Sequence, residues 1–217
     1  MNSKKKFAVV LAGSGVYDGS EIHEATLILY AISKNGGEYD IFAPNIDQYH
    51  VINHITGEEM AEKRNVLVEA ARIARGNIKD LKEFDAKDYD SILFPGGFGV
   101  AKNLCTFAFK GPECDVNPDV ETALKAMYEA GKPIGALCIA PALIAKILGK
   151  VEVTIGQDMG TAEAITSLGA THVNTGHGEI VFDKKNKIVT TPCYMLDATI
   201  AQIGEGAENV VKTIMAL

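Results

Sequence analysis

The sequence predicts a single α/β domain, residues 1–217, built on a mostly parallel β-sheet. Short runs rich in Val, Ile and Phe alternate with longer segments whose apolar residues recur at the helical period, which is typical of βαβ units. A chain of 217 residues with 47% hydrophobic and 23% charged residues can bury one sizeable core. No repeat, low-complexity tract or linker divides it.

The apolar runs predict six or more strands, among them Phe7–Leu11, Tyr39–Ala43, Asp90–Phe94, Pro133–Leu137 and a hairpin of Ile180–Phe182 with Ile188–Thr191. The helical period predicts helices over Glu21–Lys34, Glu62–Ala74, Asp119–Ala130, Ile139–Leu148 and Leu196–Met215. Between Asn45 and Met60 no period is visible, so we expect an irregular excursion there.

The charge balance limits the classes of partner. A net charge of −7 disfavours nucleic acid and anionic membranes, which both need a basic surface. The basic cluster Lys4–Lys6 is expected to be a solvated N-terminus. No apolar run approaches the roughly 18 residues of a membrane span, and no secretory signal pattern precedes the first strand. We therefore expect a cytoplasmic protein that acts on a small molecule.

The four cysteines, Cys105, Cys114, Cys138 and Cys193, are far apart and form no CxxC pair. In a chain long enough to fold without staples, this spacing favours free thiols over disulfides. Because paired ligand spacing is absent, we expect no metal site made by these thiols.

Cys138 lies between a predicted strand and a predicted helix, with the small residues Ala136 and Ala140 on either side. This arrangement is that of a nucleophile elbow. The N–H groups and positive dipole end of the following helix would favour the thiolate, so Cys138 is predicted to be the most reactive of the four thiols. The alternative is a buried, inert cysteine at the start of an Ala-rich helix.

Gly96 and Gly97 end another predicted strand within the segment Pro95–Gly99. Ligands of parallel α/β sheets bind beyond the carboxyl ends of the strands. The N–H groups of Gly97 and Ile139 could then face one oxygen and act as an oxyanion hole. The alternative is a glycine turn without a chemical role.

The first βα loop, Gly13–Glu21, resembles a dinucleotide-binding fingerprint, but Asp18 stands where the third glycine is expected. No acidic residue follows the second strand, which further disfavours NAD. We expect this loop instead to bring Glu21, His23 or Glu24 to the site. The alternative is that these acids only complement the helix dipole.

His50 and His54 have the spacing of two metal ligands on one helical face. They lack the glutamate of an HExxH motif, and the residues between them are poor helix formers. Loop histidines are therefore favoured over a metal site, and no cofactor is expected.

Five segments give the chain a family likeness: Gly15–Ala25, Val51–His54, Pro95–Leu104, Cys138–Ala142 and Ile188–Pro192. In these segments, which extend nearly end to end, it resembles the ThiJ/PfpI superfamily, and within it the ElbB group, known as glyoxalase or enhancing-lycopene-biosynthesis proteins. The resemblance implies a flavodoxin-like three-layer sandwich of the class I glutamine amidotransferase-like type and a homodimer.

The resemblance also implies the site. Cys138 would be the nucleophile, Glu24 the neighbouring glutamate, and Gly97 the oxyanion residue. For the ElbB group the implied activity is cofactor-independent conversion of glyoxal to glycolate, with a connection to isoprenoid biosynthesis. Many superfamily members carry a histidine near positions 154–158, and this sequence has none there. Asp158 and His177 are the candidates to replace it.

Two other functions stay open. The protein could be a non-enzymatic redox sensor or stress-response factor, whose cysteine is oxidised to a sulfinic acid. It could also be a cysteine hydrolase or amidase, against which the missing histidine counts. Fold alone does not decide, because this architecture supports many reactions.

Overall fold

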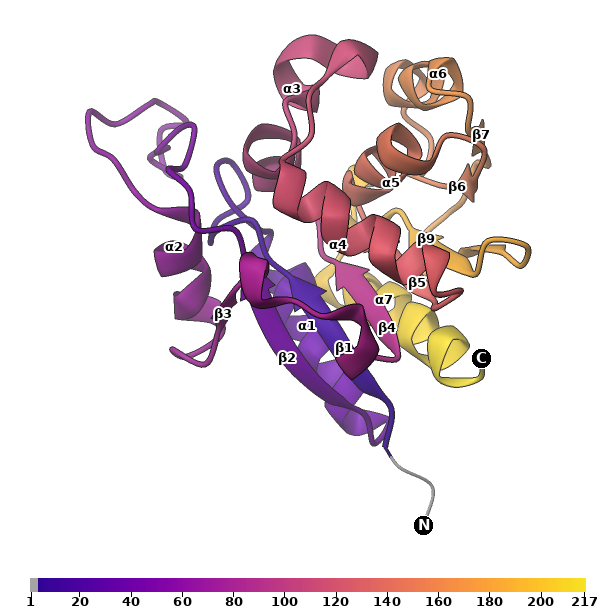
Figure 1. The fold of residues 1–217 in the computed structure, drawn as a ribbon. Coiled ribbons are helices and arrows are strands. Elements are labelled where there is room, and N and C mark those ends of the chain that lie inside the picture. The colour runs from indigo at the N-terminus through magenta and orange to yellow at the C-terminus, as the bar shows by residue number, and fades with distance from the viewer. Residues whose placement is uncertain (1–3) are drawn as a thin grey trace.

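The computed structural model describes residues 4–217 and contains a seven-stranded sheet with the order β3-β2-β1-β4-β5-β9-β8 (Figure 1). Its strands are β1 Lys6–Val10, β2 Glu38–Ala43, β3 Lys79–Asp80, β4 Ser91–Phe94, β5 Ile134–Leu137, β8 Val181–Asp183 and β9 Ile188–Thr191. Neighbouring strands are parallel except β8 and β9, which form the predicted antiparallel hairpin. The predicted fold class is confirmed.

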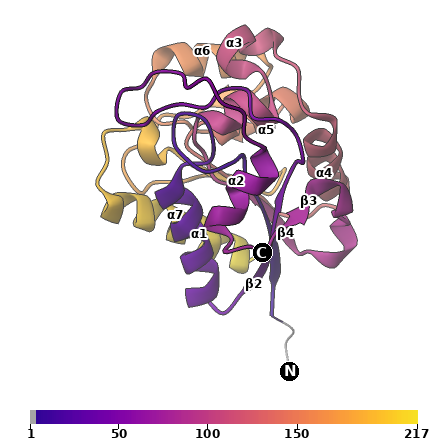
Figure 2. The same cartoon turned by 90° about the vertical axis from the view of Figure 1, so that its left-hand side faces the viewer.

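The helices cover both faces of the sheet. They are α1 Ile22–Lys34, α2 Val66–Ile73, α3 Phe107–Lys110, α4 Pro118–Glu129, α5 Ala140–Leu148, α6 Met159–Ser167 and α7 Ile200–Met215. Helices α1 and α7 pack together on one side of the strands, and α4 lies on the other side (Figure 2). Within residues 4–217, no helix has both the length and the apolarity needed to cross a bilayer.

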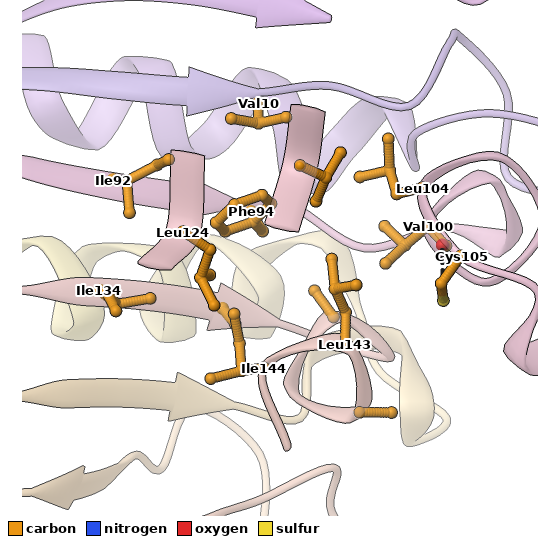
Figure 3. Packing of buried hydrophobic residues seen from close by; sticks show 14 of the residues in the cluster. Val10, Ile92, Phe94, Val100, Leu104, Cys105, Leu124, Ile134, Leu143 and Ile144 are labelled. Carbon is orange, nitrogen blue, oxygen red and sulfur yellow. Dashed lines mark hydrogen bonds between the residues drawn. The ribbon is translucent and has the colours of Figure 1, made fainter. Parts of the chain in front are cut away.

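Each face of the sheet has its own hydrophobic core. On the side of α4 and α5, Phe94 of β4 packs with Leu124, Ile134 and Leu143 (Figure 3). On the opposite side, residues of α1 and α7 pack against Phe7, Val9 and Leu93 among others. The central strands are therefore buried on both faces, which explains why their sequences are continuous apolar runs rather than alternating ones.

Several predicted boundaries were wrong. The helix predicted from Glu62 begins at Val66, because the Asn65 side chain accepts a hydrogen bond from the Val68 N–H (3.1 Å) and caps the helix there. The helix predicted from Leu196 begins at Ile200, after a capping box at Thr199.

The sequence prediction also missed short elements. These are β3, a separate two-stranded sheet of β6 (Glu152–Val153) and β7 (Thr171–His172), helices α3 and α6, a π-helix over Val100–Leu104, and 3₁₀ turns at Leu81–Glu83, Ala86–Asp88, Gly111–Glu113 and Cys193–Met195. A strand of two residues cannot display an alternating pattern, and a helix of one turn cannot display a period of 3.6 residues. The nine-residue α6 buries only Ile165, so its sequence shows no apolar stripe.

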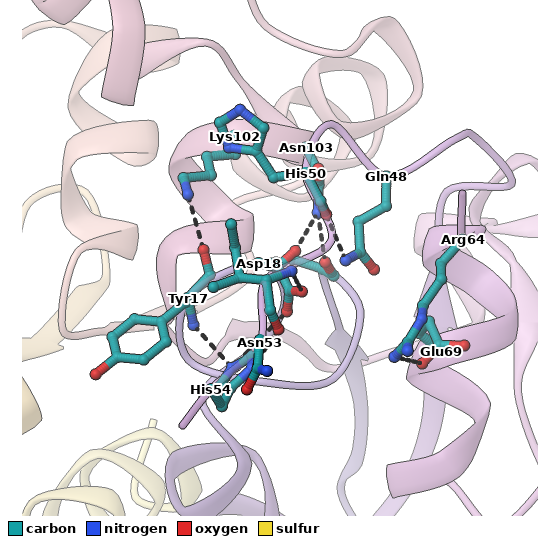
Figure 4. A network of polar contacts seen from close by, with 12 residues as sticks. Tyr17, Asp18, Gln48, His50, Asn53, His54, Arg64, Glu69, Lys102 and Asn103 are labelled. Atoms are coloured by element: carbon teal, nitrogen blue, oxygen red, sulfur yellow. Dashed lines mark hydrogen bonds and ion pairs between the residues drawn. The ribbon is translucent and has the colours of Figure 1, made fainter. Parts of the chain in front are cut away.

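The irregular excursion after β2 is anchored to the first βα loop by polar contacts (Figure 4). Asp18 accepts a hydrogen bond from the Ile52 N–H (2.7 Å), and His54 Nε2 accepts one from the Tyr17 N–H (3.2 Å). The Asn103 side chain donates to the carbonyl oxygen of Asp18 (2.9 Å) from the π-helix. Asp18, which departs from the dinucleotide fingerprint, therefore has a structural role in this loop.

Candidate functional site

The nucleophile elbow is present in the backbone. Cys138 follows β5 directly and adopts φ = 58°, a left-handed conformation that L residues rarely take. Its N–H donates to the carbonyl oxygen of Thr191 (3.0 Å), which ties the turn to β9. Ala136 and Ala140 are fully buried, so larger side chains would not fit beside the turn. The chain reverses here, and the thiol lies at the carboxyl edge of the sheet.

The turn after β4 meets the elbow at the same edge. A Cβ added to Gly96 would lie 2.7 Å from Glu24 Oε2 and 3.0 Å from Cys138 Sγ, and closer still to the Cys138 Cβ. Only glycine allows this close approach. The next residue, Gly97, has φ = 97°, which also requires glycine. The sequence prediction that these two turns meet is therefore matched by the structure.

The first βα loop holds the turn after β4 in place. The Glu21 N–H donates to the Gly96 carbonyl (2.9 Å), and the Gly99 N–H donates to the Gly19 carbonyl (2.8 Å). Within the loop, the Gly15 N–H donates to the Ser20 carbonyl (2.9 Å). Backbone N–H groups that would hold a pyrophosphate are thus used inside the protein, which argues against dinucleotide binding.

Glu24 of α1 is fully buried beside the thiol. Its Oε2 accepts a hydrogen bond from the Gly96 N–H (2.8 Å), and its Oε1 accepts one from the Tyr194 N–H (3.3 Å). Burial, and next the nearby charge of Glu21, raise the pKa of Glu24 to about 8, although both N–H donors oppose this rise. The Glu24 carboxyl is therefore protonated for most of its population at pH 7.

Burial, followed by the Glu24 charge, also raises the pKa of the Cys138 thiol well above its usual range. This direction is opposite to the thiolate expected from the helix N-terminus. The dipole and N–H groups are outweighed because Cys138 is only 8% exposed and lies beside a carboxyl group. Cys138 and Glu24 interact directly, so ionisation of Glu24 adds to the rise of the thiol pKa.

The N–H groups of Gly97 and Ile139 both point at the Cys138 sulfur and oppose the rise of its pKa. They are the two donors that the sequence predicted as an oxyanion hole. Because they converge on the sulfur, an oxygen bonded to a carbon attached to that sulfur would lie close to the same donors. The geometry can therefore stabilise negative charge on the sulfur or on an oxygen of a bound intermediate.

Cys138 lines a cavity of about 570 Å³. Its wall includes Cys138 and Ile139, apolar side chains from the turn after β4 and from α3, and polar groups from α6 and the loop after β9. The lining residues are Val16, Gly97, Phe98, Ala101, Phe107, Ala108, Cys138, Ile139, Asp158, Thr161, Tyr194 and Met195. This size suits a small organic molecule.

The candidates for the missing histidine differ in position. Asp158 lines the cavity and caps α6 by accepting a hydrogen bond from the Thr161 N–H (2.8 Å). His177 lies in the segment before β8 and does not belong to the cavity lining. His23 is exposed, and its Nδ1 lies 2.8 Å from the hydroxyl oxygen of Tyr194, a residue that lines the cavity.

Tyr194 and Phe107 were missed in the sequence because no motif surrounds them. Tyr194 follows β9, the parallel neighbour of β5, so strand order would have revealed its place next to the elbow. Phe107 belongs to the short α3, whose position depends on tertiary contacts.

His54 Nε2 accepts the Tyr17 N–H, so the lone pair that could bind a metal is already used. Among residues 4–217, no group of three or more His, Cys, Asp and Glu side chains is arranged to hold a metal ion.

The contact between Cys105 and Cys114 shifts the pKa of a thiol outside the elbow. Cys105 and Cys114 are buried and hydrogen-bonded to each other. This bond lowers the pKa of Cys114 to about 7. The lowered thiol pKa therefore belongs to Cys114 and not to Cys138, which the spacing of the cysteines did not reveal.

Comparisons with known proteins agree with this architecture. The human mitochondrial glutamine amidotransferase-like class 1 domain-containing protein 3 is 50% identical over 222 residues, covering 98% of this chain and 83% of the human protein. The mitochondrial ES1 protein of zebrafish is 37% identical over 229 residues, covering 97% of this chain and 85% of that protein. The chain belongs to the ES1 family of amidotransferase-like proteins. No family model matches it.

Solved structures share the fold of this ES1-type chain. An isoprenoid biosynthesis protein with an amidotransferase-like domain from Ehrlichia chaffeensis has a TM-score of 0.92 and 35% identity, covering 98% of each chain. Glyoxalase III from Candida albicans has a TM-score of 0.61 and 17% identity, covering 98% of this chain and 96% of that one. At this identity the second match shows only the shared fold.

The expected cytoplasmic location is contradicted by these relatives. The human, rat and zebrafish proteins are all named mitochondrial. The expectation was wrong because it rested on charge, apolar runs and free thiols, and none of these distinguishes the cytosol from another compartment that keeps thiols reduced.

Proposed function

We propose that this protein converts glyoxal and related small dicarbonyls to hydroxy acids, with glycolate as the product from glyoxal, through a nucleophilic Cys138 and without a cofactor. The observation that carries the proposal is the buried pair of Cys138 and Glu24, which lies beneath two convergent N–H groups at a cavity. Conversion of a dicarbonyl to a hydroxy acid needs these three parts: a nucleophile, an oxyanion site and a group that moves a proton between adjacent carbons.

In the first step, the Cys138 thiol loses its proton to water, the sulfur attacks one aldehyde carbon, and the electron pair of the C=O double bond moves to the oxygen. The N–H groups of Gly97 and Ile139 stabilise that oxygen while charge develops on it. The protonated Glu24 then gives its proton to the oxygen. The result is a neutral hemithioacetal on Cys138 and an ionised Glu24.

In the second step, the Glu24 carboxylate removes the proton from the carbon bonded to sulfur and returns a proton to the adjacent carbon. The hydroxyl proton of the hemithioacetal moves to the neighbouring oxygen, and the hemithioacetal becomes a thioester of the hydroxy acid. Water then hydrolyses the thioester, which releases glycolate, returns a proton to the Cys138 sulfur and reprotonates Glu24. Because the pKa of Glu24 is raised to about 8, this group can accept and donate protons near neutral pH.

The proposal is tested with purified protein and glyoxal, without glutathione and after removal of metal ions. We expect glycolate to form in proportion to the glyoxal consumed, and Cys138→Ala to abolish its formation. Cys114→Ala is the matched control, because it removes a buried thiol with a lowered pKa and should keep the activity. Absence of glycolate, or unchanged activity of the Cys138→Ala variant, would contradict the proposal. We extend the proposal to a role connected with isoprenoid biosynthesis, because the Ehrlichia chaffeensis relative is named an isoprenoid biosynthesis protein.

A redox sensor is the second candidate function. A protonated Glu24 and two N–H donors could hydrogen-bond the oxygens of a sulfinic acid formed on Cys138. Peroxide would then add two oxygen atoms to Cys138 in a protein that turns over no aldehyde. A hydrolase or amidase is disfavoured because no histidine belongs to the lining found among the described residues.

A further inference from the structure

The cavity above Cys138 is larger than glyoxal requires. Pockets of about 300–1,000 Å³ enclose drug-sized ligands, and this one measures about 570 Å³. Glyoxal consists of only two joined carbonyl groups. It would fill the space beside the sulfur and leave most of the cavity to water. A substrate that uses the whole cavity must carry a further group.

Most of the cavity wall is apolar. The apolar lining residues are Val16, Phe98, Ala101, Phe107, Ala108, Ile139 and Met195. Phe98 is 50% exposed, so an aromatic face in the wall is open to solvent. Removing such surface from water favours binding of an apolar group, and an aromatic group gains further from contact with phenylalanine rings.

The charge of the wall disfavours an acidic group. The Asp158 carboxylate accepts hydrogen bonds from the Thr161 hydroxyl and then from its N–H, which lower the pKa of Asp158 and keep it ionised. Within the described chain, no lysine, arginine or histidine belongs to the lining. The Lys102 ammonium lies 5.3 Å from the centre of the Phe98 ring, but it donates to the Tyr17 carbonyl oxygen (2.8 Å). An anionic group in the cavity would therefore face a carboxylate without a basic partner.

We infer that the preferred substrate of Cys138 is an α-oxoaldehyde with an uncharged apolar substituent about as large as an aromatic ring. This inference rests on the proposed function, because it assumes that the aldehyde carbon is attacked by the Cys138 sulfur. Beyond the proposed function, we infer that the cavity selects the substituent of the aldehyde. Thr161 and Asp158 in the cavity wall contribute to this selection.

The first test compares kcat/KM for glyoxal and phenylglyoxal. We expect phenylglyoxal to be preferred by about tenfold or more, since differences of this size follow from a modest apolar group. Thr161→Phe places a ring in the cavity and should lower the ratio of phenylglyoxal to glyoxal towards one. Thr166→Phe is the matched control on the same helix, because Thr166 is exposed and outside the cavity lining, and it should keep the ratio. An equal or lower kcat/KM for phenylglyoxal overturns the inference.

The second test isolates the charge of Asp158. Phenylglyoxal is compared with 4-carboxyphenylglyoxal, which differs by one negative charge. Asp158→Asn should raise the relative kcat/KM of the charged compound by about threefold or more. Asparagine can also accept the Thr161 N–H, so α6 keeps its cap. An unchanged ratio overturns the role of Asp158.

A third measurement separates this inference from the proposed function. Mass spectrometry follows alkylation of Cys138 by iodoacetamide and by its N-phenyl derivative, and neither reaction requires turnover. We expect the aromatic reagent to react faster in the wild type and to lose this advantage in Thr161→Phe. If the aromatic reagent shows this advantage while no aldehyde is converted, the preference of the cavity for an aromatic group is confirmed and the proposed function is contradicted. If the aromatic reagent has no advantage, or neither reagent reaches Cys138, the cavity preference is overturned even if glyoxal is converted.

Discussion

Replacing Glu24 by glutamine tests what the Glu24 carboxyl does in the buried pair of Cys138 and Glu24. The side chain keeps its shape, but its single oxygen can accept the hydrogen bond of only one of the Gly96 and Tyr194 N–H groups, and it cannot exchange a proton. If Glu24 moves the proton between the substrate carbons, turnover of a dicarbonyl should fall by about 10²-fold or more. Alkylation of Cys138 should continue. It should also extend to lower pH, since the carboxylate that raises the pKa of Cys138 is gone.

The same substitution has a thermodynamic consequence that needs no substrate. The pKa of Glu24 is raised in the folded protein from 4.5 to about 8, because the buried carboxyl resists ionisation. Between these pH values the unfolded chain ionises Glu24 and the folded protein does not, so stability is lost as the pH rises through this window. The full loss corresponds to about 5 kcal/mol of unfolding free energy as an upper limit.

Urea denaturation at pH 5 and pH 8 measures this loss. The unfolding free energy of the wild type should decrease between the two values by several kcal/mol more than that of Glu24→Gln. Glu69→Gln is the matched control, because Glu69 is also a buried helical glutamate but pairs with Arg64 and Arg72 on the surface of α2. It should keep the wild-type dependence on pH. Parallel profiles for the wild type and Glu24→Gln would refute the raised pKa of Glu24.

Three further outcomes are expected. Gly96→Ala should destabilise the protein by about 1–3 kcal/mol and lower turnover by about 10²-fold, because the new Cβ displaces Glu24 and Cys138, whereas Gly160→Ala should be tolerated. Urea denaturation and kinetics check both variants. Normal turnover of Gly96→Ala would contradict the close packing of Gly96 against Glu24 and Cys138. The alkylation rate of Cys114 should level off above pH 7, while that of Cys138 should still rise beyond pH 8. Mass spectrometry across pH 6–9 measures both rates. The reverse order would disprove the assigned pKa shifts. Dialysis against EDTA should leave glyoxal turnover unchanged, and a loss that zinc restores would show that a metal takes part.

The meeting of the two turns could be predicted from the sequence. In a parallel sheet, the carboxyl ends of the strands lie at one edge, so the residues after β4 and β5 had to be close once both strands were recognised. Because α1 begins at the same edge after β1, Glu21, His23 and Glu24 were all expected there, and the family resemblance singled out Glu24. Strand recognition was reliable because these strands are buried on both faces.

The protonation of the pair could not be predicted in the same way. The helix N-terminus behind Cys138 is visible in the sequence and favours a thiolate. The opposing effects, burial of the sulfur and the charge of Glu24, depend on how tightly α1 packs against the elbow. The lowered pKa of Cys114 likewise depends on a contact with Cys105 across a loop. Such effects are tertiary and leave no local pattern.

A thiol with a raised pKa is not an inert thiol in this arrangement. The form in which Glu24 keeps its proton lacks the like charge that adds to the rise of the Cys138 pKa, and the N–H groups of Gly97 and Ile139 oppose that rise. That form combines a nucleophile with an acid beside it, and both are needed when an aldehyde is attacked. The Glu24 carboxyl therefore raises the pKa of the Cys138 thiol in the free protein, and it supplies the proton once a carbonyl oxygen becomes charged.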